Sequence, residues 1–215
     1  SSPITENGSN QLTLDADGDI VLNNEITRTG SGGIQLDAGG EVVINTNINA
    51  NGTGLLDINA GHTITLNTGK VINASSGSSD VTLDAVNGIT LGGDIARSGT
   101  GALQIASANQ FIDLTTDGSI THSGSGDVSL SSVEEITLTG DITQSGGGDV
   151  SMAISNGGIT GPGDIHMGSS PVTFAINQDG GGVATTWSGI LTGSGSAFTK
   201  TGTGSLRLSG DHAYS

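Results

Sequence analysis

Short runs of alternating apolar and polar residues recur along the whole chain. In each run of the first series, two apolar side chains flank a polar one, which is typical of a β-strand with one buried face. Successive runs start 22 or 25 residues apart. They are Leu12–Leu14, Ile34–Leu36, Leu56–Ile58, Val81–Leu83, Leu103–Ile105, Val128–Leu130, Val150–Met152 and Val172–Phe174. A period of this length indicates stacked copies of one small structural unit.

Two further apolar features complete most units. A second run follows about eight residues after the first begins, at Ile20–Leu22, Val42–Ile44, Ile64–Leu66, Ile89–Leu91, Ile112–Leu114 and Ile136–Leu138. A third apolar position follows at Ile26, Ile48, Ile72, Ile95, Ile120, Ile142 and Ile165. No stretch keeps the spacing of a helix, so each unit is predicted to hold three short strands.

Strands this short are marginal alone, and stacking one unit on the next solves that problem. The pattern therefore predicts an all-β protein, a right-handed parallel β-helix of about nine coils of about 22 residues, with three short strands per coil. We divide the chain into an N-terminal segment (residues 1–11), regular coils (12–171) and less regular C-terminal coils (172–215).

Composition and charge narrow the functional classes. The 215 residues include 38 glycines, which suit the corners between strands. The net charge of −16 argues against nucleic-acid and anionic-membrane partners, because both require basic patches. The chain has no cysteine, which excludes a disulfide scaffold and a cysteine metal site.

Two resemblances bear on function. The repeats, such as "ITLTGDITQSGGGDVSM" at 136–152, resemble those of secreted bacterial β-helix exoproteins, the filamentous-haemagglutinin-like proteins and autotransporter passenger domains. Residues 187–215 look like the autotransporter-associated β-strand repeat, although His212 departs from its pattern. The matching positions are Gly193, Gly195, Phe198, Lys200, Gly202, Gly204, Leu206, Leu208, Gly210 and Tyr214.

These resemblances imply export, a β-helix and an adhesive or scaffold role, with no catalytic residues to carry over. We therefore expect a structural and adhesive module of a large extracellular or cell-surface bacterial protein, associated with the outer membrane through its parent chain. Its expected partners are the neighbouring coils of the parent and a host or cell-surface glycan or protein. We expect no cofactor, no nucleic-acid partner and no membrane insertion by this segment.

A carbohydrate-active or glycan-binding β-helix is the alternative. Cleavage of a glycoside requires paired carboxylates, and lyase chemistry requires a basic residue beside a cation site. The basic residues do not recur beside an acidic cluster, so we predict no enzymatic activity. They are Arg28, Lys70, Arg97, Lys200 and Arg207.

Three aspartates share one position of the repeat. Asp15, Asp37 and Asp84 follow the first run of their units, and Asn59 fills that position between them. They could form a weak cation ladder, but a solvated edge is the preferred interpretation and no metal site is predicted.

Two other residue types are candidates for binding. The histidines at 62, 122, 166 and 212 occupy different positions of the repeat and are expected at the surface or in corners. Trp187 is the single candidate for a glycan contact, and packing in a less regular coil is the preferred interpretation.

Overall fold

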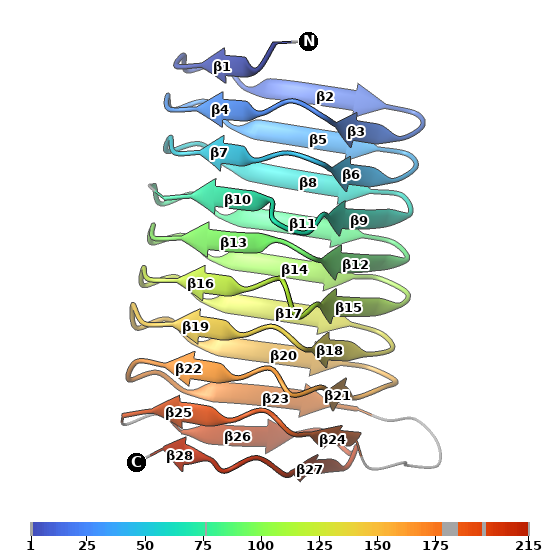
Figure 1. Cartoon of the computed structure of the whole chain (residues 1–215), viewed down its shortest axis with the longest axis vertical. Helices are drawn as coiled ribbons and strands as arrows, with labels where there is room; N and C mark the ends of the chain where they lie inside the picture. The colour runs from blue at the N-terminus through green and yellow to red at the C-terminus, as the bar shows by residue number, and fades with distance from the viewer. Residues whose placement is uncertain (1, 76, 178–184, 195–196, 215) are drawn as a thin grey trace.

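The computed structural model describes residues 2–75, 77–177, 185–194 and 197–214. Every regular element within these ranges is a β-strand, and the strands pair in parallel. Figure 1 shows them as stacked rungs with the two termini at opposite ends. The fold is a β-solenoid of about nine coils with three strands per turn, so the predicted β-helix is confirmed.

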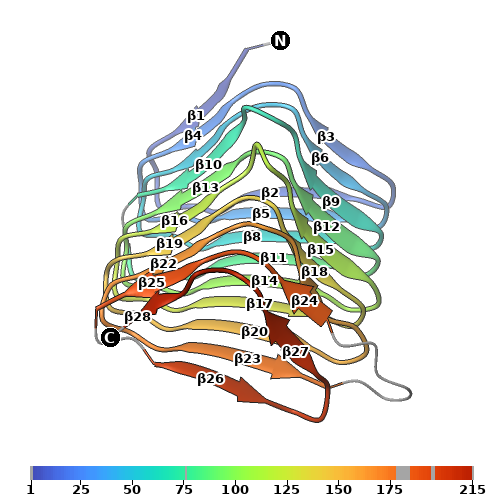
Figure 2. The ribbon, with the colours of Figure 1, turned by 60° about the horizontal axis from the view of Figure 1, so that its bottom comes forward.

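Three long sheets form the three faces of the solenoid, as the tilted view in Figure 2 shows. Sheet A contains β1 (Ile4–Glu6), β4 (Ile26–Arg28), β7 (Ile48–Ala50), β10 (Val71–Ala74), β13 (Asp94–Arg97), β16 (Ile120–His122), β19 (Ile142–Gln144), β22 (Ile165–Met167), β25 (Leu191–Gly193) and β28 (Ala213–Tyr214). Sheet B contains β2 (Leu12–Ala16), β5 (Ile34–Ala38), β8 (Leu56–Ala60), β11 (Val81–Ala85), β14 (Leu103–Ser107), β17 (Val128–Ser132), β20 (Val150–Ile154), β23 (Val172–Ile176) and β26 (Phe198–Thr201).

Sheet C is shorter than the other two. It contains β3 (Ile20–Leu22), β6 (Val42–Ile44), β9 (Thr63–Leu66), β12 (Gly88–Leu91), β15 (Phe111–Leu114), β18 (Ile136–Leu138) and β21 (Ile159–Thr160). The next two strands on this side, β24 (Thr185–Trp187) and β27 (Leu206–Leu208), pair with each other as a separate sheet. A single bridge between Gly161 and Trp187 connects them to sheet C.

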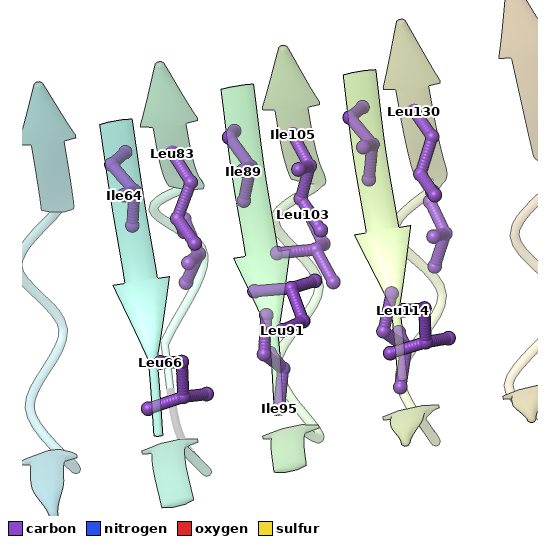
Figure 3. Close-up of a cluster of buried hydrophobic side chains, with 14 of the residues drawn as sticks. Ile64, Leu66, Leu83, Ile89, Leu91, Ile95, Leu103, Ile105, Leu114 and Leu130 are labelled. Atoms are coloured by element: carbon purple, nitrogen blue, oxygen red, sulfur yellow. The ribbon is translucent and has the colours of Figure 1, made fainter. Parts of the chain in front are cut away.

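The apolar residues of the repeat stack in register and fill the interior. Leu83, for example, pairs with Ile58 on one side and Ile105 on the other. Figure 3 shows these side chains pointing into the space between the sheets. Aliphatic side chains of one size on successive coils can repeat the same contacts, which suits β-branched and leucine residues on a pleated surface. The core is therefore one continuous cluster from Ile20 to Leu191.

Close backbone approach explains much of the glycine content. A Cβ added to Gly52 would lie 1.8 Å from the carbonyl oxygen of Gly30, one coil earlier. The same holds for Gly124 above Gly99. Both positions lie in the corner between sheets A and B, where successive coils contact each other through their backbones. Any side chain there would force the coils apart.

The C-terminal region differs from the regular coils. Leu191 takes the place of the inward isoleucine in sheet A, at a longer interval from Ile165 than the 22 to 25 residues of the earlier coils. His212 stands next along the chain at that position, one residue before β28. Gly195 of the repeat-like motif and Ser215 lie outside the described residues.

Candidate functional site

The aspartates singled out from the sequence lie on the outer face of sheet B. Backbone pairing aligns Asp15 with Asp37, Asp37 with Asn59, and Asn59 with Asp84. We call these four residues the outer acidic column. The strand alternation places them outside because the residues on either side of each one belong to the inward-facing set.

Amide and hydroxyl donors separate the carboxylates. Asn59 Nδ2 donates to Asp37 Oδ1 at 2.7 Å and to Asp57 Oδ2 at 3.0 Å. Gln35 Nε2 donates to the other oxygen of Asp37 at 2.6 Å, and the Thr82 hydroxyl donates to Asp57. These bonds supply both carboxylates with hydrogen-bond donors from neighbouring side chains.

The amide and hydroxyl donors of this network bind Asp37 and Asp57 and not Asp84. Partial burial, and then the negative charge of Asp57, raise the pKa of Asp84 above its ordinary value. Among the described residues, no group of three or more His, Cys, Asp or Glu side chains is positioned to hold a metal ion. The cation ladder at Asp15, Asp37 and Asp84 stays the less favoured interpretation beside a solvated edge.

A groove of about 620 Å³ runs beside this column, where the chain turns from sheet B towards sheet C. The acidic column and small residues such as Ala38, Gly39 and Gly61 line it. The two glycines belong to a column that holds Asp17 in the first coil and Val86 in the fourth, and a Cβ at either glycine would meet a carbonyl oxygen of the preceding coil. The groove therefore offers carboxylate and amide groups next to a small apolar surface.

Trp187 does not line any surface. Its side chain is 0% exposed, and its indole nitrogen donates to the Gly163 carbonyl at 3.0 Å. The ring packs edge-on against Phe174, with centroids 5.5 Å apart, and stacks on His212 at 5.6 Å. This burial agrees with the preferred interpretation of Trp187, packing in a less regular coil, and leaves no exposed ring surface for a sugar.

A second polar column was not expected from the sequence. The last residues of seven strands of sheet A are all buried and face the corner that leads to sheet B. We call them the inner corner column: Arg28, Ala50, Ala74, Arg97, His122, Gln144 and Met167. Of the histidines expected at the surface or in corners, His122 is a fully buried strand residue whose ring contacts two corners.

The four polar members of the inner corner column bind backbone carbonyls of the glycine-rich corners. Arg97 Nε donates to Gly101 O at 3.0 Å within its own corner, and its Nη2 donates to Ser79 O in the preceding coil. Arg28 repeats this arrangement, with Nε donating to Gly32 O at 2.7 Å. Burial lowers the pKa of Arg97, and the charge of Asp80 opposes that shift. These arginines stabilise corners rather than a ligand.

Alternation of the sequence contains the signal for this column. Arg28 and Arg97 each follow an inward isoleucine by two residues, so they must face the same side. The general rarity of buried arginine conceals that signal.

The comparisons with known proteins give no assignment. No family model, no curated protein and no solved structure matches this chain. Among the described residues, the structure has no helix that could span a membrane.

Proposed function

We propose that this chain is a structural and adhesive segment of a large bacterial protein that is secreted or displayed at the cell surface. The stacked coils act as a rigid spacer within the parent protein, and their outer faces contact a glycan or protein on another cell. The segment reaches the outer membrane only through its parent chain and acts without enzymatic activity.

The continuous apolar core carries this proposal. One cluster of buried side chains passes through every described coil up to Leu191, so the solenoid resists bending between coils. At a coil spacing of about 4.8 Å, nine coils span roughly 40 Å. The repeat style and the motif at 187–215 support export, since both resemble secreted exoproteins.

Antibodies against this chain test its location on intact cells that produce the full-length protein. Surface labelling that disappears after external protease treatment is the expected result. Labelling only after cell lysis would overturn the proposal. Beads coated with the chain should also adhere to host cells more than albumin-coated beads do. Surface labelling without adhesion would restrict the role to structure.

The groove favours a second candidate function, the binding of an uncharged glycan. Asp37 can accept and Asn59 can donate hydrogen bonds to sugar hydroxyls, and Val86, which is 39% exposed, offers an apolar contact. Successive column residues are one coil apart, about 4.8 Å. A neutral sugar chain lying parallel to the stack would therefore meet one polar group per coil.

Titration calorimetry with neutral oligosaccharides tests this candidate. Binding should weaken at least tenfold in the D37A/N59A double variant and remain unchanged in D149N, an exposed aspartate in a corner outside the groove. Equal binding by both variants would exclude the groove as the site.

A further inference from the structure

His122 occupies a sealed position in the inner corner column. Its side chain is 0% exposed, between Arg97 of the preceding coil and Gln144 of the next. Nδ1 lies 3.1 Å from the carbonyl oxygen of Gly124, and Nε2 lies 3.2 Å from that of Gly101. One imidazole ring thus faces the backbone of two successive corners.

The two carbonyl contacts are incompatible with a single N–H group. A neutral imidazole has one donor nitrogen and one acceptor nitrogen, so it satisfies one carbonyl and turns a lone pair towards the other. Only an imidazolium ring would donate to both. Gln144, one coil later, avoids this conflict: its Nε2 donates to Gly126 O at 2.6 Å, and its Oε1 accepts from Gly146 N at 3.0 Å.

The surroundings oppose the positive charge that both contacts would favour. Burial is the largest influence and lowers the pKa of His122; the charge of Arg97 lowers it further, while the carbonyls of Gly101 and Gly124 and the charge of Asp127 raise it. The net direction is downward from the ordinary value near 6.5. Arg97 and Asp127 are the charged groups that face the ring, and Gln144 on the other side is neutral.

We propose that His122 makes the joint between the coils of β13, β16 and β19 sensitive to acid. At neutral pH the uncharged ring holds the two corners together and fills the space between them. In mild acid the ring takes a proton most easily when the corner opens and water reaches it. The glycine corners around residues 101 and 124 then separate before the rest of the solenoid unfolds.

The sign of the pH effect follows from the two states of the histidine. Between the lowered pKa of the folded chain and the ordinary value near 6.5, the unfolded chain binds a proton that the folded chain does not. The stabilising contribution of His122 is therefore fully present above about pH 6.5 and decreases as the pH falls through this window.

Thermal unfolding of wild type and H122Q at pH 7.5 and 5.5 tests the proposal. Glutamine occupies the equivalent position in the next coil, at Gln144, and it does not titrate. The wild-type Tm should fall between the two pH values by on the order of 2–4 °C more than that of H122Q. The Tm of H62Q, a variant that changes an exposed histidine, should fall between the two pH values by as much as that of the wild type. Equal losses in wild type and H122Q would overturn the proposal.

A titration of the wild-type chain by NMR gives a test that does not depend on the variant folding. The ring signals of His122 should titrate below the ordinary histidine value near 6.5. Amides of the corners after β13 and β16 should lose protection from hydrogen exchange at pH 5.5 before amides of sheet B. Titration of His122 at or above that ordinary value, or uniform loss of protection, would overturn the proposal.

Discussion

Two polar columns run along this solenoid, one inside and one outside. The inner corner column places Arg28, Arg97, His122 and Gln144 against glycine-rich corners. The outer acidic column places Asp15, Asp37, Asn59 and Asp84 on the surface of sheet B. Both arise because a stacked repeat brings equivalent positions of successive coils into contact, whatever residue occupies them.

The polar groups of the two columns have different roles in the structure. Inside, the four polar side chains contact carbonyl oxygens of the glycine-rich corners, so the column supports the backbone. Outside, the carboxylates face water and repel each other, and Asn59 and Gln35 reduce that repulsion with hydrogen bonds. The inner column should therefore determine stability, and the outer column should be nearly dispensable for folding.

Replacing an arginine of the inner corner column should have the largest effect on the free energy of unfolding. In R97M the methionine fills much of the same space but removes the arginine donors to Ser79 O and Gly101 O, of which Gly101 O keeps only its contact with His122 Nε2. Loss of two charge-assisted bonds, partly offset by no longer burying a charge, predicts a destabilisation of about 2–4 kcal/mol. Urea denaturation should show a lower midpoint with an unchanged slope.

The matched control for this prediction is R207M. Arg207 is exposed on β27, and its replacement should change the stability by less than about 0.5 kcal/mol. Similar losses in R97M and R207M would show that the inner bonds contribute little, and the contrast between the two columns would disappear.

Replacing the inner glutamine should have a smaller effect. Q144M removes one donor to Gly126 O and one acceptor for Gly146 N, both uncharged bonds. Met167 occupies the next position of the column, so a methionine fits the space. We expect a loss of about 1–2 kcal/mol in urea denaturation. A loss larger than that of R97M would contradict the view that charge-assisted bonds dominate the column.

The fold followed from the sequence because one pattern determines it. Runs such as Leu12–Leu14 and Ile34–Leu36 fix the strand faces, and their constant spacing fixes the register. The final coils were harder to predict, because the interval between Ile165 and Leu191 exceeds the usual spacing. Trp187 has no equivalent in earlier coils, so the sequence could not reveal that it packs against Phe174.

The candidate sites were only partly predictable. Shared repeat position identified the alignment of Asp37 with Asp15, whereas the donors from Asn59 and Gln35 depend on side-chain geometry. The buried role of His122 depends on corner carbonyls from two coils, Gly101 and Gly124. A linear sequence does not show where those carbonyls point.

Replacing Asp84 of the outer acidic column should have the smallest effect on stability, and it should stabilise the protein where the inner substitutions destabilise it. Asp84 has a raised pKa because of partial burial and the charge of Asp57, so its ionised form is unfavourable in the folded chain. Removing that charge in D84N should stabilise the protein at pH 7 by roughly 0.2–0.5 kcal/mol, since the site is partly exposed to solvent. Urea denaturation of both proteins across a pH series measures the difference.

The pH dependence of that difference tests its cause. Because the folded-state pKa of Asp84 lies above its ordinary value of 3.8, wild type gains stability as the pH falls through the folded-state pKa towards 3.8. The advantage of D84N should therefore be constant at neutral pH and vanish below about pH 3.8. If D84N is instead less stable than wild type at pH 7, and EDTA removes the difference by lowering the stability of wild type, the carboxylate of Asp84 binds a cation. In that case the outer column would also contribute to stability. The two columns would then differ only in their partners, which are backbone carbonyls inside and a cation outside.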